Sequence, residues 1–487
     1  MCIVEPTIQL LIVQAFYRSG RFTVQAALSV PTGNPQKYRM KKITSLLLLV
    51  SITGFSFGQS QKADQILHAK EVERVERILS ADNMEGRRTF SPAIDRAADF
   101  IADEFKKAGL QTWNNSGSYL QSFAMVRTKF LSASCTFDGV SVDTKDVIVV
   151  TCTPDLQVTE KSGFEKVAIS KGANLTIEAR KYMNANKNYL VMVDTSFARS
   201  FNTLTRMKAQ LFKTDKNVVF VLGNMNPQAY TVDAKHEITE QKLANVMGMI
   251  PGKSKKDEYV IFSGHYDHLG IMGKDRQGNV LTDSIFNGAN DDAAGTTAVI
   301  MLAKYFNALK DNERTLLFVA FTAEEVGGFG SQYFSRQLKA DDVKAMFNIE
   351  MIGTESKWGR NSAYITGYER TDMGKILQGN LEGTGFTFYP DPYTTQNLFF
   401  RSDNATLARL GVPAHTISTS KMDNEPNYHK ASDEIGTLDM ENMAMIMKAI
   451  ALSSKGIISG RETPSRVDVS DLNNPRPAAT PPAGKNQ

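Results

Sequence analysis

Four short polar clusters in the second half of the chain contain side chains that could do chemistry. The first, Ser263-Gly264-His265-Tyr266-Asp267-His268, places an imidazole directly after an apolar run and a carboxylate two residues later. His265 can offer a ring nitrogen to a metal ion, while Asp267 fixes the tautomer of that ring from behind. The alternative is that His265 is an ordinary loop residue, and we interpret His268 in that way.

The second cluster places two adjacent carboxylates, Asp291 and Asp292, in a loop of small residues that runs from Asn287 to Gly295. Aspartate commonly caps the start of a helix, which is the simple explanation for one of them. A single cap does not explain two neighbouring acids, and two closely spaced cations need one bridging carboxylate. We interpret Asp291 as that bridge.

The third cluster places Glu324 and Glu325 between an apolar strand and the glycine-rich turn at Gly327 and Gly328. Neighbouring side chains diverge, so one glutamate can bind a metal ion while the other lies next to a metal-bound water and exchanges a proton with it. Two solvated charges in a turn are the alternative.

The fourth pair, Glu350 and His429, is separated by more sequence. Glu350 closes an apolar strand, where a charge is costly unless it is paired or bound to a metal. His429 indicates little by itself. Together, the two histidines and the carboxylates offer nitrogen and oxygen ligands without thiolates. This mixture suits zinc, and manganese or cobalt fits less well.

Regular elements must bring these clusters together. Apolar runs predict strands at 259–263, 315–322 and 345–351, and a helix through 298–309 between the first two. Strand, helix and strand at this spacing predict an α/β fold with a doubly wound, mostly parallel central sheet flanked by helices. Three of the clusters directly follow a strand, where open parallel sheets bind their ligands.

The pattern of apolar and polar residues along the chain also predicts how it is divided into segments. A capped helix begins at Pro92 and ends at Gly109, and short apolar runs within 123–235 predict the strands of an inserted β-rich subdomain. The tail after Gly460 has no apolar period, so we expect it to be disordered. The expected segments are an upstream region with a signal peptide at 1–58, the start of the main domain at 59–122, the insert at 123–235, the catalytic domain at 236–460 and the tail at 461–487.

The composition indicates a globular protein, with 42% hydrophobic residues and 34 glycines among 487 residues. The formal net charge is +4, from 56 basic and 52 acidic residues that are spread along the chain. Nucleic-acid binding needs a concentrated basic region, so we expect no nucleic acid as a partner.

The segment from Met40 to Gly58 is typical of a signal peptide, with two lysines before the apolar run Leu46 to Phe57. The run is well short of the roughly 20 residues that span a bilayer as a helix, so we expect no stable membrane anchor. We expect a periplasmic or secreted protein whose start codon is recorded upstream of the true one. In such an oxidising compartment Cys135 and Cys152 could pair.

The spaced clusters resemble those of the M28 family of zinc peptidases, which includes bacterial leucyl-type aminopeptidases and glutamate carboxypeptidases. The resemblance covers roughly residues 66–123 and 237–456. Asp82-Asn83-Met84-Glu85-Gly86-Arg87 and Ser402-Asp403 are further family-like segments. Several spaced motifs occur in the family's order, which makes the resemblance specific.

The resemblance implies two zinc ions that share Asp291. The implied ligands are His265, Asp291 and Glu350 for one ion, and Asp291, Glu325 and His429 for the other. Glu324 would be the general base for a hydroxide shared by the ions. Tyr428 would donate a hydrogen bond to the oxyanion, with simple packing as the alternative.

Three further features follow from the resemblance. The peptide bond between Asp291 and Asp292 is expected to be cis. Glu350 departs from the family, in which aspartate is most common at this position. Residues 123–235 lie where many members carry a protease-associated insert.

The leading interpretation is a zinc-dependent exopeptidase that releases N-terminal amino acids from a peptide substrate. A carboxypeptidase or dipeptidase of the same family is the main alternative, because one sequence does not identify the residues that would receive an ammonium or a carboxylate. A glutaminyl cyclase or an inactive binding ectodomain fits less well, because Glu324 and all five candidate ligands are present.

Overall fold

A computed structural model describes residues 15–18, 21–24, 62–274 and 278–470, and the chain divides into two units, Met1–Ser60 and Gln61–Gln487. In the first unit, β1 (Ala15–Arg18) and β2 (Arg21–Val24) form an antiparallel pair. The signal peptide expected at about residues 40–58 lies outside the described residues. Among the described helices, none is long and apolar enough to cross a membrane.

The second unit is built around a mixed sheet of eleven strands, whose main path is β18-β17-β19-β16-β12-β15-β11-β3-β4. Parallel pairing joins β12 to β15 and to β16, and β16 to β19, whereas β11 pairs antiparallel with β15 and β3. The α/β fold and its parallel centre are therefore confirmed, and the antiparallel flanks make the sheet mixed. The strands on this path are β3 (Leu120–Phe137), β4 (Val140–Val142), β11 (Tyr230–Ile250), β12 (Lys255–His265), β15 (Arg314–Phe321), β16 (Val343–Ile349), β17 (Ser362–Ile365), β18 (Thr387–Pro390) and β19 (Ala414–Ser418).

Helices cover both faces of this sheet. Phe318 of β15 belongs to one hydrophobic cluster, and its neighbours Leu317 and Val319 belong to another, because successive strand residues point to opposite faces. The first cluster includes residues of α2 (Ala69–Leu79), α3 (Pro92–Lys107), α6 (Ala294–Leu309), α8 (Met373–Gly379), α10 (Met440–Ser453) and α11 (Lys455–Ile458). The second includes residues of α7 (Phe329–Ser335) and α9 (Asn404–Ala408). The predicted helices at 92–109 and 298–309 are present as α3 and α6.

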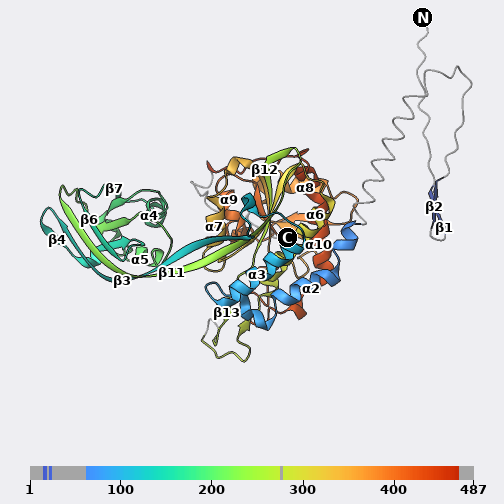
Figure 1. The fold of residues 1–487 in the computed structure, drawn as a ribbon, viewed down its shortest axis with the longest axis horizontal. Coiled ribbons are helices and arrows are strands. Elements are labelled where there is room, and N and C mark those ends of the chain that lie inside the picture. Colours follow the sequence, from blue (N-terminus) through green and yellow to red (C-terminus); the bar gives the residue numbers. More distant parts are fainter. Residues whose placement is uncertain (1–14, 19–20, 25–61, 275–277, 471–487) are drawn as a thin grey trace, which may run out of the picture. The chain divides into compact units, whose positions relative to one another are not determined.

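Strands β3 and β11 continue out of the central sheet into the inserted segment (Figure 1). The strands predicted there are found as β5, β8 and β10, in a second sheet of order β5-β10-β8-β7. Helix α4 was not predicted, because only Leu175 and Ala179 of its residues are buried and the apolar period is weak. The elements of the insert are β5 (Val147–Val150), β6 (Asp155–Thr159), β7 (Glu165–Ile169), α4 (Leu175–Met183), β8 (Tyr189–Val193), α5 (Thr203–Met207), β9 (Gln210–Phe212) and β10 (Val218–Leu222).

Cys135 and Cys152 of the insert are free thiols, so no disulfide joins them. Cys135 lies in β3 opposite Val232 of β11, and burial raises the pKa of its thiol to about 11. The thiol is therefore protonated at neutral pH and packs as an apolar side chain.

The start of the C-terminal tail is ordered by contacts with the main body, which contradicts the disorder expected from residue 461. Val467 is buried, and the guanidinium of Arg466 donates to the backbone oxygens of Ala340 and Val343. These contacts involve residues far away in the sequence, so composition does not reveal them. Residues 471–487 lie outside the described part of the chain.

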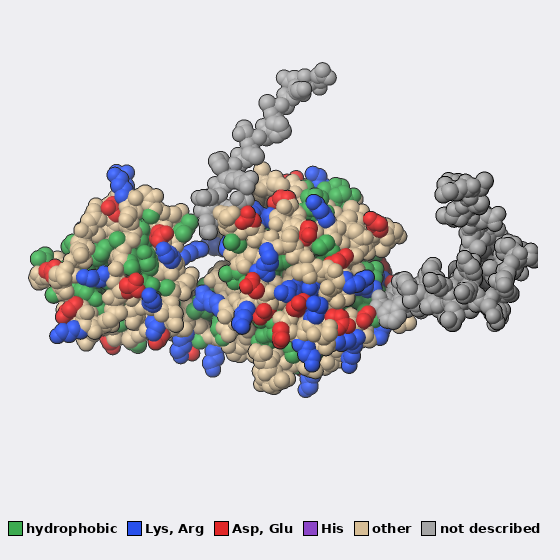
Figure 2. Space-filling model, turned by 90° about the horizontal axis from the view of Figure 1, so that it is seen from above, with side chains coloured by type: hydrophobic (Ala, Val, Ile, Leu, Met, Phe, Trp, Pro, Cys, Tyr) green, Lys and Arg blue, Asp and Glu red, His purple; other side chains and the backbone are tan. Residues whose placement is uncertain are grey.

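Charged side chains of both signs are interspersed on the face shown in Figure 2. Such interspersion agrees with the small formal net charge of +4.

The first testable prediction concerns Gly295, where α6 lies close to the end of β16. A Cβ at this position would collide with the backbone oxygen of Ile349 and with both carboxylate oxygens of Asp292. We expect Gly295→Ala to lower the free energy of unfolding by about 2 kcal/mol in urea titrations, as overpacked sites do. Gly379→Ala is the control, because a Cβ there has no atom within 4 Å. We expect the control to change stability by no more than about 1 kcal/mol, and equal losses in both variants would contradict the prediction.

Candidate metal centre

The carboxyl ends of three parallel strands meet at one edge of the central sheet. β12 ends at His265, β15 ends at Phe321 shortly before Glu324, and β16 ends at Ile349 directly before Glu350. His265 and Phe321 are partners in the strand register, so these two ends are level. Parallel pairing therefore brings three of the predicted clusters together, as is usual for ligand sites of such sheets.

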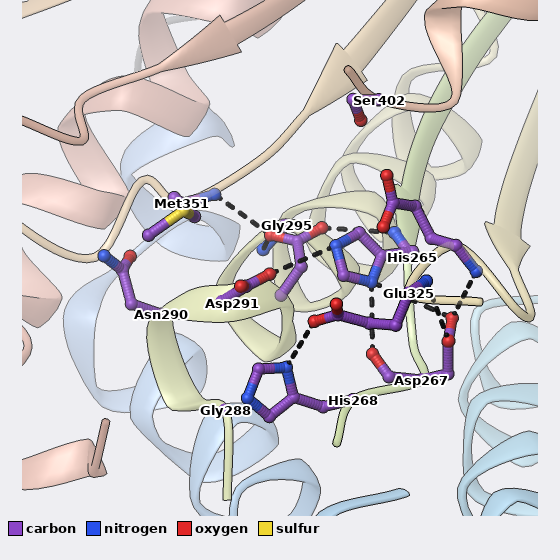
Figure 3. Close-up of polar contacts among 12 residues, drawn as sticks. His265, Asp267, His268, Gly288, Asn290, Asp291, Gly295, Glu325, Met351 and Ser402 are labelled. Atoms are coloured by element: carbon purple, nitrogen blue, oxygen red, sulfur yellow. Dashed lines mark hydrogen bonds and ion pairs between the residues drawn. The ribbon is translucent and has the colours of Figure 1, made fainter. Parts of the chain in front are cut away.

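Asp291 lies at the centre of the cluster and is buried. Its Oδ1 is 3.3 Å from Nε2 of His265, and its Oδ2 is 3.2 Å from Nε2 of His429. Figure 3 shows Asp291 and His265 facing each other. The two oxygens of one carboxylate thus serve two histidines, an arrangement that suits a bridge between two cations.

Two groups of potential metal ligands share Asp291. One consists of His265, Asp291 and Glu350, and the other of His268, Asp291 and Glu325. Within each group, one ligand atom from every residue lies within 4.8 Å of the others. The first group is the set expected for one zinc ion. The extra methylene of Glu350 does not take its carboxylate out of reach.

The second group contains His268, which was not expected, and not His429, which was expected and lies beside the group. Nε2 of His429 is 3.3 Å from Oε2 of Glu325, and Nδ1 of His268 is 2.8 Å from Oε1 of the same glutamate (Figure 3 labels His268 and Glu325). The interpretation of His268 as an ordinary loop residue is wrong, because its ring is buried against Glu325. A second imidazole three residues after His265 in one loop is the signal that could have identified it.

Several buried atoms of the cluster have no hydrogen-bond partner among the described residues. They are both ring nitrogens of His268, Oε1 of Glu325 and Oε2 of Glu350. The contact between His268 and Glu325 is short, but its geometry is not that of a hydrogen bond. Buried carboxylates are costly unless a cation accompanies them. The oxygen and nitrogen donors present, without thiolates, fit zinc.

Asp267 orients the ring of His265, as expected, but it does so with its backbone carbonyl and not with its carboxylate. Nδ1 of His265 lies 3.1 Å from the carbonyl oxygen of Asp267, whereas the carboxylate oxygen Oδ1 is 3.9 Å away. A carbonyl can only accept, so it favours the proton on Nδ1 and leaves Nε2 free to bind a metal. The Asp267 carboxylate instead accepts hydrogen bonds from the backbone N–H groups of Glu324 (2.9 Å) and Glu325 (3.3 Å). It therefore positions the glutamate pair.

Asp292 joins three ligand-bearing segments without being one of the candidate ligands. Its Oδ2 accepts from the N–H of His265 (3.1 Å), and its Oδ1 accepts from the N–H groups of Gly295 and Met351 (3.0 Å each). The peptide bond between Asp291 and Asp292 is cis, as the family resemblance implies.

Arg87 connects the same loops through hydrogen bonds to their backbone oxygens. Its fully buried guanidinium donates to the backbone oxygens of Tyr266, Asn287 and Gly288, and to that of Leu79. These contacts link the loop that carries His265 to the loop that carries Asp291. This explains in physical terms why the segment ending at Arg87 accompanies the metal-binding clusters.

The charges of the cluster are strongly coupled. Burial alone would raise the pKa of Asp291, but hydrogen bonds with His265 and His429 hold it well below its ordinary value. Burial raises the pKa of Glu324 well above its ordinary value, and the carboxylates of Glu350 and Asp403 add to that effect. The surroundings of Asp291 therefore favour its ionised form, whereas those of Glu324 favour its protonated form.

Comparisons with known proteins agree with this cluster. Residues 245–453 match the model of Peptidase family M28. A probable zinc metalloprotease of Pyrenophora teres f. teres (strain 0-1) is 32% identical over 126 residues, which are 26% of each chain. Leucine aminopeptidase 1 of Ajellomyces capsulatus (strain H88) is 27% identical over 216 residues, which are 41% of this chain and 52% of the relative.

The chain thus spans between about a quarter and about half of the length of these curated relatives. Among solved structures, the aminopeptidase from Aneurinibacillus sp. strain AM-1 aligns over 82% of this chain and 96% of its own, with 17% identity and a TM-score of 0.48. A zinc aminopeptidase from Bacillus subtilis aligns over 83% and 99%, with 16% identity and a TM-score of 0.47.

Fold and site together define an α/β protein with a candidate centre for two adjacent metal ions at the carboxyl edge of its sheet. Residues 245–453, which match the model of Peptidase family M28, contain all the candidate ligands.

The second prediction separates the two adjacent glutamates. Glu325 is in a candidate ligand group and Glu324 is not. If the unmodified protein binds two zinc ions per chain, we expect Glu325→Gln to bind about one. Glu324→Gln should retain both, which makes it the matched control. Elemental analysis after dialysis measures the ratio. Loss of zinc from the Glu324 variant alone would reverse the two roles.

The third prediction concerns His268. We expect His268→Asn to weaken zinc binding at the second candidate group by about 10- to 100-fold, whether the ring binds the ion itself or holds Glu325. Chelator competition measures this. His236→Asn removes another buried imidazole, which lies in β11 and outside the cluster, and should leave the competition curve unchanged. Identical curves for both variants would exclude a role for His268 at the metal centre.

Proposed function

We propose that this chain is a zinc-dependent aminopeptidase that hydrolyses the first peptide bond of its substrate. The match of residues 245–453 to the model of Peptidase family M28 supports a metallopeptidase, and the relatives that are named aminopeptidases support cleavage at the amino end. The observation that carries the choice of terminus is the excess of buried carboxylates around the candidate centre.

More carboxylates surround the candidate centre than two divalent cations neutralise. They are Asp267, Asp291, Asp292, Glu324, Glu325, Glu350 and Asp403. Asp403 is buried, and burial raises its pKa to about 7, so it carries only part of a negative charge at neutral pH. The remaining negative potential favours a substrate ammonium and disfavours a substrate carboxylate.

A small cavity of about 40 Å³ next to the candidate centre marks where the first residue of such a substrate would enter. Glu350 lies in its wall together with apolar and aromatic side chains, among them Tyr364, Leu398 and Met422. A free N-terminal residue offers both an ammonium, which would lie beside Glu350, and a side chain, which would pack against these apolar walls.

Different residues would bind the metal ions and transfer the proton during hydrolysis. His265, Asp291 and Glu350 would hold one zinc ion. Asp291 and Glu325 would hold the other, together with His268 of the same group or with His429 beside it. When bound, the ions supply Lewis acidity for the substrate carbonyl and lower the pKa of water. Glu324 takes the proton from the attacking water and returns it to the leaving amine.

Tyr428 is placed to assist at the oxyanion. Its ring stacks on His429 with 3.9 Å between centroids, and it lines the same cavity as Glu350. Burial and the nearby carboxylates raise the pKa of its hydroxyl above its usual range. The hydroxyl therefore stays protonated and can donate to developing negative charge.

One observation favours the second candidate, a carboxypeptidase. Arg401 lines the cavity as well, and a guanidinium pairs well with a terminal carboxylate. Its Nη1 donates to the side-chain oxygen of Gln396 at 3.3 Å, and the residue is exposed.

We also propose that the protein is exported. The pattern from Met40 to Gly58 supports this proposal.

The fourth prediction tests the proposed function. Leucyl-anilide with a free amine should be cleaved, N-acetyl-leucyl-anilide should not, and a chelator should abolish the activity. Glu324→Gln, with its zinc retained, should lose on the order of 100-fold or more in kcat, measured by release of the aniline. Equal cleavage of both anilides would refute the aminopeptidase. Preference for N-blocked dipeptides with a free carboxylate would establish the carboxypeptidase instead.

A further inference from the structure

A second pocket, of about 390 Å³, lies where the insert joins the main body. One wall is formed by residues 88–91, which follow the family-like segment that ends at Arg87. The other wall is formed by Arg127 of β3, Gln210 of β9 and Gln241 of β11. We call it the arginine pocket, because both Arg88 and Arg127 line it.

The charges of the arginine pocket are not neutralised within the described part of the chain. Neither Arg88 nor Arg127 forms an ion pair with a described carboxylate, and both residues are exposed. The stem of Arg88 packs against Gly270, which limits the directions that its guanidinium can take. Nε2 of Gln210 donates to Oε1 of Gln241 at 3.3 Å, which leaves the amide N–H groups of Gln241 as further donors. Two guanidinium groups and an amide suit a carboxylate.

The arginine pocket is connected to the metal centre by a short chain of hydrogen bonds. Thr89, in its wall, donates through its hydroxyl to Oδ2 of Asp267 at 2.9 Å. Oδ1 of Asp267 accepts from the N–H of Glu324, also at 2.9 Å. One buried carboxylate therefore touches both the pocket wall and the general base.

The path of β11 places the pocket beyond the edge of the sheet that carries the candidate ligands. β11 runs antiparallel to β15, with Val246 opposite Ala320 near the end of β15. The residues of β11 that precede Val246, including Gln241, therefore extend past that end. A substrate that leaves the centre in this direction meets the arginine pocket.

We propose that the arginine pocket binds a carboxylate of the substrate on the leaving side of the scissile bond. The inference rests on the proposed function, and it adds that short peptides with a free carboxylate are the preferred substrate class. An extended peptide covers roughly 3.3 to 3.6 Å per residue, so a carboxylate two or three residues beyond the bond reaches roughly 7 to 11 Å. Either the C-terminal carboxylate or an acidic side chain can supply the group.

The fifth prediction compares kcat/KM for Leu-Gly-Gly with that for its C-terminal amide. The free acid should be favoured by about tenfold in the unmodified protein, as expected for a charge-assisted contact. Arg127→Gln and Arg88→Gln should each bring the ratio toward one. The ratio is taken within one variant, so a general loss of activity cancels. Arg199→Gln is the matched control, because this exposed arginine of the insert does not line the pocket, and it should keep the ratio.

A third substrate, Leu-Gly-Asp-amide, separates the two sources of the carboxylate. Cleavage as fast as that of Leu-Gly-Gly means that an acidic side chain serves, and slow cleavage means that the C-terminus is required. A wild-type ratio near one for both carboxylate peptides would overturn the proposal, and so would a ratio unchanged in both arginine variants. If no peptide is cleaved, the proposed function fails. Calorimetric titration of the zinc-loaded protein with Leu-Gly-Gly and its amide then tests the arginine pocket alone.

Discussion

The buried carboxylate of Asp291 is the constraint on which the rest of the structure depends. It lies between His265 and His429 and belongs to both candidate ligand groups, so each side of the centre is defined relative to it. A buried carboxylate surrounded by other carboxylates is unfavourable without compensating positive charge. The two histidines supply part of that compensation, and two zinc ions would supply the remainder.

Residues that bind no metal hold this arrangement in place. Asp292 gathers the backbone of three ligand-bearing segments, and Arg87 joins two loops through their carbonyl oxygens. Asp267 orients His265 with its carbonyl and the glutamate pair with its carboxylate. Much of the local polar sequence is therefore explained by backbone hydrogen bonds, which keep the ligands within reach of one another.

The insert contributes to the proposed chemistry through its connection to the main body. Strands β3 and β11 leave the sheet at the edge where the candidate ligands lie, and they bring Arg127 and Gln241 to the pocket that Arg88 also lines. The hydrophobic residues of the insert form clusters of their own, so its core is largely separate from that of the main body. In the proposed function, this geometry lets the insert influence which peptides are cleaved without touching the reacting atoms.

The sequence by itself determined the elements and the chemistry of the clusters. Apolar periodicity depends on near neighbours, so it predicted the strands at the centre of the sheet and helices α3 and α6. Residue types at the strand ends predicted nitrogen and oxygen ligands, including the unusual Glu350.

Only the tertiary structure decided how distant segments meet. It placed His268 against Glu325, made the flanks of the sheet antiparallel, ordered the residues around Val467, and brought Arg88 and Arg127 to one pocket. Each of these contacts depends on the path of the whole chain, because packing and register, rather than local pattern, bring such residues within reach of each other.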